Sequence, residues 1–438
     1  MRDVLFTLLF TGLLLLCFRY HYVAPLLWAW LGLMSPHRLT YGFAYSLPFA
    51  QITAFLILAM LFVSRDRQPF PKSSTALLLV AFYVWECITS IASFNNPEYV
   101  WEAWIKVTKI QLVLFATLML LHGKKQIDLL VWVMVLSLGF YGFKGGLFTI
   151  AHGGRSMVMG PPGSFIEVTN HLALAMLMII PLGYYLATQL THRWVRIGLY
   201  VVMALTALSV LGTTSRGALV GSLVMAVMLA LKSKRRWLML AIIATLAMGM
   251  FAIMSDQWAD KMGTITTHED HSAQSRLYTW KMIWNLAMHH PVTGGGFQVT
   301  ENPATWYRYA VTDWAKAYSP HSIYFQALAE HGFVGLALYL GIGISCWRRC
   351  GKIIKSCTTE STLWAANLAR MVQVSIAGFA VGGAFVNLVN FDLPYYVVAL
   401  AILTDVAVAK QLQAEKSASP LVQSPALGAG ASSRMGTP

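Results

Sequence analysis

The sequence predicts an all-α polytopic membrane protein with about twelve transmembrane helices. Its residues are 57% hydrophobic and only 11% charged, and its mean hydropathy of +0.59 lies far outside the range of soluble globular proteins. Apolar runs long enough to cross a bilayer recur along the chain. Neither the alternating pattern of a membrane β-barrel nor a repeat of fixed period is present.

The apolar runs define the expected crossings. They extend near residues 42–64, 74–94, 106–122, 127–150, 171–189, 195–211, 217–231, 236–254, 321–346, 367–387 and 392–409. Two shorter runs, 4–17 and 23–34, come first. If Met1 and Arg65 lie on the same side, residues 4–34 contribute an odd number of crossings, so one broken crossing or a crossing with a re-entrant piece is expected. No small-residue cleavage site follows the first run, which favours a retained helix.

Charge predicts the orientation of these helices. Lys and Arg cluster in every second connection, so all the clusters can face the cytoplasm together. The clusters are Arg65/Arg67/Lys72, Lys124/Lys125, Arg193/Arg196, Lys232/Lys234/Arg235/Arg236 and Arg348/Arg349/Lys352/Lys355. The net charge of +14 therefore indicates membrane topology rather than nucleic-acid binding. The intervening connections, among them 95–105, 151–170 and 212–216, then face the opposite side.

These patterns divide the chain into four parts. Residues 1–254 form the N-terminal transmembrane helices, residues 255–320 a large outer loop with amphipathic helices, and residues 321–410 the C-terminal transmembrane helices. Residues 411–438 become small, polar and rich in Pro and Gly, which predicts a disordered cytoplasmic tail. The five cysteines lie in or beside apolar segments, and they indicate neither a disulfide framework nor a zinc site.

Cations in the outer connections predict an anionic ligand, because such connections are usually poor in Lys and Arg. The exceptions are Arg155, Arg216, Arg276, Lys281 and Arg308. Arg216 occupies a short turn between two apolar helices, which places its guanidinium at the membrane surface. An arginine fork suits bidentate contact with phosphate oxygens, and helix N-terminal amides add to that contact. The alternative is an interfacial arginine that reaches lipid headgroups.

Arg276 begins a predicted amphipathic helix in the large loop. The apolar stripe of this helix consists of Leu277, Trp280, Ile283, Trp284 and Ala287. Such a helix is expected to lie along the outer membrane face, capped by Ser275 and ended by His290-Pro291 and the flexible Gly294–Gly296 segment. Arg276 in its first turn then either binds substrate or belongs to an ordinary interfacial helix.

His321 follows Pro320 at the start of the next apolar run, where water meets the bilayer. A helix N-terminus disfavours an imidazolium ion, so the neutral imidazole there can take a proton from a hydroxyl near neutral pH. The alternative is a helix-start residue satisfied by backbone or water. His331, just before Gly332, is expected to be structural.

Glu86 suggests a different class of function. It lies within an apolar run, where an unpaired carboxylate is costly, and it would be the proton site of a transporter. A transporter predicts that Glu86→Gln abolishes function and that His321→Ala spares it, whereas an enzyme predicts the reverse. The chain has no acidic pair for a hydrated metal, no nucleotide phosphate loop and no Ser-His-Asp arrangement. These features favour a donor already activated on a membrane carrier, with a diphosphate leaving group.

Three segments together resemble the O-antigen ligase and polymerase superfamily of bacterial surface-polysaccharide assembly, particularly the ligases that finish lipopolysaccharide. The first is the Ser215-Arg216-Gly217 turn, and the second is Ser275-Arg276 in the large outer loop. The third runs from Pro320 through His321 to His331-Gly332 and opens the next helix. The Gly160–Ser164 loop, which precedes Asn170, is further similar to a subgroup of O-glycosylation ligases.

The resemblance implies an inverting, metal-independent glycosyltransferase of the type C membrane class at the periplasmic side of the bacterial inner membrane. It implies that His321 is the base that activates an acceptor hydroxyl, while Arg216 and Arg276 hold the undecaprenyl diphosphate of a polysaccharide donor. Weaker candidates for substrate contacts are Arg155, Asn170, Lys281 and Arg308. The expected acceptor is a sugar hydroxyl of lipid A-core, with polymerisation, protein O-glycosylation and transport of a lipid-linked sugar as open alternatives. Besides these substrates and membrane lipids, no cofactor, metal or nucleic acid is expected.

Overall fold

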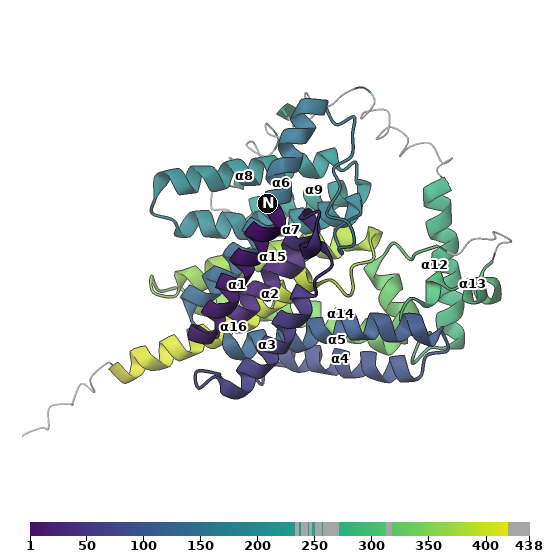
Figure 1. Cartoon of the computed structure of the whole chain (residues 1–438), viewed down its shortest axis with the longest axis horizontal. Coiled ribbons are helices and arrows are strands. Elements are labelled where there is room, and N and C mark those ends of the chain that lie inside the picture. The colour runs from purple at the N-terminus through teal and green to yellow at the C-terminus, as the bar shows by residue number, and fades with distance from the viewer. Residues whose placement is uncertain are drawn as a thin grey trace, which may run out of the picture.

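Long helices form one bundle, and a smaller helical layer covers one of its ends (Figure 1). The computed structural model describes residues 1–232, 271–311 and 318–418, with a few isolated positions between 236 and 256. Eight helices in this described part are long and apolar enough to cross a membrane, as a multi-pass membrane protein requires. The expected total of twelve is not confirmed, because the run 236–254 lies almost entirely outside the described residues and two other apolar helices are shorter than a full crossing.

The eight candidate spans follow the expected apolar runs, with shifted ends. They are α4 (Ser74–Ile91), α5 (Pro97–Leu120), α6 (Lys124–His152), α7 (Thr169–Gln189), α8 (Arg193–Gly212), α14 (Ile323–Ser356), α15 (Leu363–Gly382) and α16 (Asp392–Ala418). Helix α5 begins well before the expected residue 106, since Asn96 caps it through the backbone N–H of Glu98 and Pro97 occupies its first position. Most of the stretch 95–105, expected as a loop, is therefore helical.

The first two helices form an antiparallel hairpin rather than the one broken crossing expected for residues 4–34, and the alternative of a crossing with a re-entrant piece stays a prediction. The elements here are α1 (Arg2–Arg19), α2 (Val23–Met34), η1 (Pro36–Leu39), η2 (Phe43–Tyr45) and α3 (Phe49–Val63). The Asp3 carboxylate accepts hydrogen bonds from the backbone N–H groups of Gly42 and Ala44, at 2.9 and 3.1 Å, which joins the start of α1 to the segment after α2. His21, between the two helices, contacts Ser64 at the end of α3 at 2.7 Å. Met1 and Arg65 thus lie at opposite ends of the bundle.

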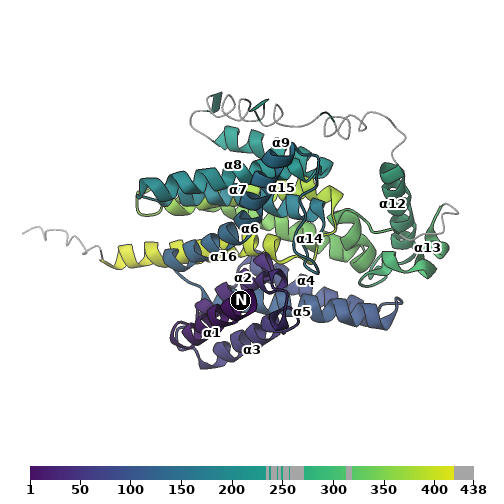
Figure 2. The ribbon, with the colours of Figure 1, turned by 45° about the horizontal axis from the view of Figure 1, so that its top comes forward.

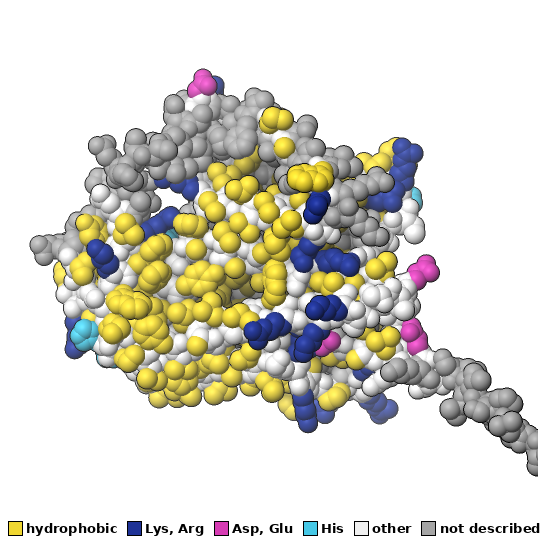
Figure 3. All heavy atoms as spheres, turned by 180° about the vertical axis from the view of Figure 1, so that it is seen from behind, with side chains coloured by type: hydrophobic (Ala, Val, Ile, Leu, Met, Phe, Trp, Pro, Cys, Tyr) yellow, Lys and Arg dark blue, Asp and Glu magenta, His cyan; other side chains and the backbone are white. Residues whose placement is uncertain are grey.

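The basic connections meet at one end of the bundle, in keeping with the charge pattern. Arg349 of α14 donates to the Thr75 hydroxyl of α4 at 3.0 Å, and Lys410 of α16 donates to Gln68. Lys124 of α6 lies over the Trp364 ring of α15. Figure 3 shows one face of the molecule, on which hydrophobic side chains cover a broad area and several Lys and Arg side chains gather right of centre.

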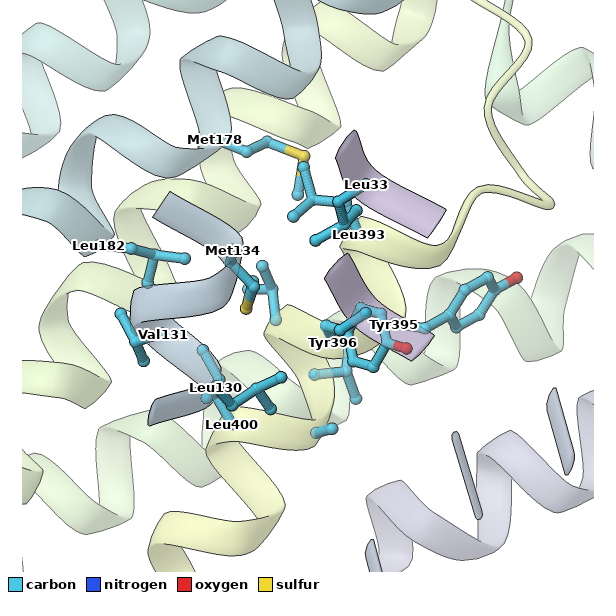
Figure 4. Close-up of a cluster of buried hydrophobic side chains, with 14 of the residues drawn as sticks. Leu33, Leu130, Val131, Met134, Met178, Leu182, Leu393, Tyr395, Tyr396 and Leu400 are labelled. Atoms are coloured by element: carbon cyan, nitrogen blue, oxygen red, sulfur yellow. The ribbon is translucent and has the colours of Figure 1, made fainter. Parts of the chain in front are cut away.

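The core of the bundle is built on α7 and α16, whose side chains are buried on almost every side. A helix that is apolar around its whole circumference is stable only when other helices surround it. Figure 4 shows part of this core, where Met178 of α7, Met134 of α6, Leu33 of α2 and Leu393 of α16 converge. Packing against these central helices fixes the positions of the surrounding helices.

The helical layer at the other end contains α12 (His271–His289), η3 (Val299–Glu301) and α13 (Pro303–Tyr309), as Figure 2 also shows. Ile283 and Ala287 of α12 are fully buried against α13 and the first turns of α14, whereas Leu277 and Trp284 are 56% and 51% exposed. The predicted apolar stripe is thus only partly buried: Ile283 and Ala287 pack against the protein, whereas Leu277 and Trp284 stay exposed.

The ends of α12 only partly match the prediction. The helix ends at His289, as expected before His290-Pro291. It already includes His271, since His271–Gln274 contains no helix breaker, so Ser275 is an interior residue rather than the cap. The Ser275 carbonyl accepts a hydrogen bond from the Thr279 hydroxyl at 2.7 Å. Arg276 therefore lies in the second turn.

Candidate active site

A break in α14 fixes the outer layer to the bundle. Gly332 has φ 67° and ψ −170°, which interrupts the helical hydrogen bonds around it. The carbonyls of Ala329 and Glu330 instead accept from the backbone N–H groups of Gly295 and Gly296, at 2.8 and 3.0 Å. Phe333 donates to the Pro291 carbonyl at 2.8 Å. The Gly294–Gly296 segment, expected to be flexible, is therefore held by backbone pairing that only residues without a Cβ allow.

Replacing Gly332 with alanine should destabilise the protein by about 1 to 3 kcal/mol. A Cβ at this position would lie 2.3 Å from the Val292 carbonyl oxygen, and the positive φ is unfavourable for alanine. The measurement is thermal unfolding in detergent micelles. Gly343→Ala is the matched control, because a Cβ there meets no atom within 4 Å. Equal melting temperatures for the two variants would contradict this role of the break.

His321 lies two residues before the start of α14, in an unusual backbone conformation. Its φ of +47° lies in the left-handed region, which is uncommon for residues other than glycine, although asparagine, aspartate and histidine adopt it more often than the rest. Thr214, two residues before Arg216, has φ +54°, and Ser35 has φ +48°. Strain of this kind costs about 1 to 3 kcal/mol per residue and concentrates at functional sites. Gln298 in the outer layer, with φ +57°, is the fourth such residue among those described, and His321 and Thr214 are the two that coincide with or adjoin predicted site residues.

Helix α12 brings Arg276 to His321. The Trp280 indole donates to the Pro320 carbonyl at 2.8 Å and stacks on Phe325, with ring centroids 4.9 Å apart and planes inclined by 7°. Arg276 precedes Trp280 by one helical turn and so lies on the same side of α12. Arg276 and His321 are both half-buried, and they come from segments that are 45 positions apart in the chain.

Burial, followed by the nearby charges of Arg276 and His171, lowers the pKa of His321 to about 4. The imidazole is therefore neutral near neutral pH, as the sequence predicts, but for a different reason. Its position before the first turn of α14 matters less than the loss of water and the adjacent guanidinium. A neutral ring beside a fixed cation can accept a proton while the cation holds an anion.

The pH dependence of the transfer rate should reveal the interaction between His321 and Arg276. Because the pKa of His321 is about 4, transfer should stay constant from neutral pH down to about pH 5 and fall only in stronger acid. Arg276→Gln removes one cause of the lowered pKa, so the acid limb should move to higher pH. Lys281→Gln, an exposed position on another side of α12, should leave the limb in place. The measurement is the pH profile of single-turnover transfer, and identical limbs for wild type and Arg276→Gln would contradict the pairing.

Arg216 lies at the start of a helix that packs near the start of α14. The short 3-10 helix η4 (Gly383–Phe385) lies between the two helix starts. Arg216 opens α9 (Arg216–Lys232), where Ser215 accepts a hydrogen bond from the Ala218 N–H at 3.3 Å. A Cβ on Gly217 would lie 2.6 Å from Phe385, and one on Gly383 would lie 2.5 Å from Ile323. The N-termini of α9 and α14 are thus packed against opposite ends of η4, and both present backbone N–H groups suited to an anion.

The weaker candidates are dispersed. Arg155 and Lys281 are exposed. Arg308 is also exposed and lies over the Tyr309 ring, near the C-terminal end of α12, where its charge helps to lower the pKa of His290 after burial. Asn170 is half-buried in the first turn of α7. Asn170 adjoins His171, which contributes to the lowered pKa of His321.

Two residues at this end were not among the predicted site residues. His171, which follows Asn170, lies close enough to contribute to the lowered pKa of His321, and its Nδ1 contacts the Phe165 carbonyl at 3.0 Å. The Arg38 guanidinium lies 3.5 Å from the point where Gly163 would carry a Cβ. The polar pair after the Pro-Gly loop is a sequence signal for His171. No sequence pattern indicates Arg38, because η1 and the loop that contains Gly163 are far apart in the sequence and come together only in the folded structure.

Glu86 and His331 lie apart from this arrangement. Both are fully buried between α4 and α14, where the His331 Nδ1 contacts the Thr89 hydroxyl at 2.7 Å and the Trp85 indole donates to the His331 carbonyl. The two Glu86 carboxylate oxygens have no hydrogen-bond partner among the described residues. Burial without a partner favours the neutral acid. His331 is a core residue, in keeping with its expected structural role.

Comparison with known families gives this end of the molecule a context. Residues 199–340 match the O-antigen ligase family. This domain is therefore similar to the O-antigen ligases. Residues 1–191 match a family of unknown function, and no curated protein matched the chain.

The O-antigen ligase domain contains the three leading candidates, Arg216, Arg276 and His321. The region matched to the family of unknown function contributes Arg38 and His171. His171, in the region matched to the family of unknown function, therefore lies near His321 of the O-antigen ligase domain. The match to the O-antigen ligase family indicates glycosyl transfer of the ligase or polymerase type, with lipid-linked polysaccharide as the general class of substrate. The described residues contain no group of three His, Cys, Asp or Glu side chains that could hold a metal ion.

Proposed function

We propose that the protein is an O-antigen ligase that transfers a polysaccharide from undecaprenyl diphosphate to a sugar hydroxyl of lipid A-core. The observation that carries this proposal is the neutral His321 beside the cation of Arg276, at the junction of two helix N-termini. A base next to a built anion site suits the transfer of a sugar from a diphosphate carrier to a hydroxyl. The positive φ angles of His321 and Thr214 support a functional role for these two turns rather than a purely structural one.

The reaction follows from these roles. His321 takes the proton of the acceptor hydroxyl as its oxygen attacks the anomeric carbon on the face opposite the carrier. The new C–O bond forms while the bond to the diphosphate oxygen breaks, and the electron pair leaves with the diphosphate. Arg216 and Arg276 stabilise the charge that grows there. The proton on His321 then passes to water, and the sugar configuration is inverted.

The acceptor is tested by reconstituting the purified protein with a carrier-linked polysaccharide and one of three acceptors. Lipid A-core, a second carrier-linked repeat and a pilin-like protein distinguish ligase, polymerase and protein O-oligosaccharyltransferase. We expect transfer to lipid A-core alone, unchanged by EDTA. Preferential transfer to either other acceptor would replace the proposed acceptor, and loss of activity with EDTA would exclude the metal-independent mechanism.

The proposal also places the site on the periplasmic side of the inner membrane. Lys281 and Lys352 are both exposed, on the layer near His321 and at the basic end of α14. A cysteine at position 281 should react with a membrane-impermeant thiol reagent added to intact spheroplasts, and a cysteine at position 352 should react only after lysis. The opposite pattern would place the site in the cytoplasm.

A further inference from the structure

A groove of about 520 Å³ lies between α4 and α14, far from the candidate active site. Its lining includes Ser74 and Leu78 of α4 and Gly341, Ser345, Arg348 and Lys352 of α14. With a rise of 1.5 Å per residue, these α14 positions lie roughly 14 to 30 Å beyond the break at Gly332. The groove therefore lies beside the start of α4 and the basic C-terminal part of α14, at the end of the bundle opposite His321.

The groove carries an excess of positive charge. The guanidinium of Arg349 is paired with the Asp405 carboxylate and also donates to the Thr75 hydroxyl. No ion pair within the described chain joins Arg348 or Lys352 to a carboxylate. Both side chains are exposed at the mouth. Two cations therefore remain available to an anion from outside the protein.

The shape of the groove suits an amphipathic ligand. Gly341 lies two helical turns before Arg348, and a Cβ there would contact the Leu78 side chain at 3.7 Å, so Leu78 and the bare Gly341 backbone together form the floor. Ile344, which also lines the groove, is 53% exposed. The Ser74 and Ser345 hydroxyls, 3.3 Å apart, lie between this apolar floor and the cations. Polarity thus falls from the mouth toward the membrane interior.

We propose that this groove binds an anionic phospholipid, with the phosphate between Arg348 and Lys352 and one acyl chain along Leu78, Gly341 and Ile344. Basic pockets between membrane helices are suited to such headgroups. A free phosphate would use the cations but would leave the apolar floor empty. This site is independent of the proposed glycosyl transfer, because it lies at the other end of α14 and its test measures lipid binding alone.

The test measures apparent dissociation constants by native mass spectrometry of the full chain in detergent. The probes are phosphatidylglycerol and phosphatidylcholine with identical acyl chains, and glycerophosphate as a headgroup without chains. Wild type should bind phosphatidylglycerol about tenfold more tightly than phosphatidylcholine and should hold glycerophosphate far more weakly. The double variant Arg348→Gln/Lys352→Gln should weaken phosphatidylglycerol about 25-fold, at roughly fivefold per cation.

Matched controls separate this groove from general surface charge. Lys355→Gln removes an exposed cation near the same end of α14 that does not line the groove, and it should change affinity less than twofold. Gly341→Leu should weaken both lipids about tenfold by filling the floor. Gly343→Leu makes the same change two residues away, where a Cβ meets nothing within 4 Å, and should have no effect.

The result that would overturn the proposal is equal affinity of wild type for the two phospholipids. An equal loss in the double variant and in Lys355→Gln would also overturn it, as would equal effects of Gly341→Leu and Gly343→Leu. Tight binding of glycerophosphate would identify a free-anion site instead of a lipid site. Melting temperatures of all variants show whether a loss of binding reflects misfolding, and Gly343→Leu matches the helix-propensity change of Gly341→Leu.

Discussion

Replacing His321 with alanine should lower the rate of glycosyl transfer about a hundredfold to ten-thousandfold, because a general base typically contributes that much. Binding of the lipid-linked donor should stay nearly intact, since His321 acts on the acceptor. The measurements are donor affinity and single-turnover transfer by the reconstituted protein. His289→Ala, an exposed histidine beyond the site on α12, is the control and should transfer normally.

A second variant distinguishes a catalytic residue from a structural one. Asparagine tolerates a positive φ better than histidine does, so His321→Asn should keep or raise thermal stability while transfer is lost. A stable protein without transfer activity is the outcome expected for a residue whose strain serves function. A His321→Ala protein that transfers at the wild-type rate would exclude the proposed base.

Arg216→Ala and Arg276→Ala should each weaken donor binding and slow transfer as well. Charge-assisted contacts with a diphosphate contribute about 1.5 to 3 kcal/mol each, which corresponds to roughly 10-fold to 150-fold. Their effect grows during the reaction, since the diphosphate gains charge as the bond breaks. Lysine at either position should restore little of the donor binding or the transfer rate, because a point charge cannot reproduce the bidentate contact of a guanidinium.

Donor affinity and single-turnover rate, measured for each variant, check this division of roles. Lys281→Ala is the matched control, because Lys281 is exposed and lies about 140° around α12 from Arg276. A loss confined to the rate, with donor affinity unchanged in both arginine variants, would show that these arginines do not hold the donor.

The candidate site could be predicted in part because its leading residues carry local signals. Arg216 occupies a predicted short turn between apolar runs, and His321 follows a proline at the start of the next apolar run. No local sequence pattern predicts that Arg276 lies near His321, because this proximity depends on the contacts of Trp280 with Pro320 and Phe325. The approach of Arg38 to Gly163 joins segments 125 positions apart and was equally inaccessible.

The sequence by itself determined the helical class, most of the spanning runs and the common side of the basic connections. Each of these depends on composition or periodicity within about twenty residues, which fix whether a segment forms an apolar helix. The tertiary structure alone decided that α1 and α2 form a hairpin, that α12 packs on α14, and that Gly294–Gly296 pairs with the break at Gly332. Such contacts join distant segments whose local patterns are compatible with several partners, and only close packing of the whole chain selects among them.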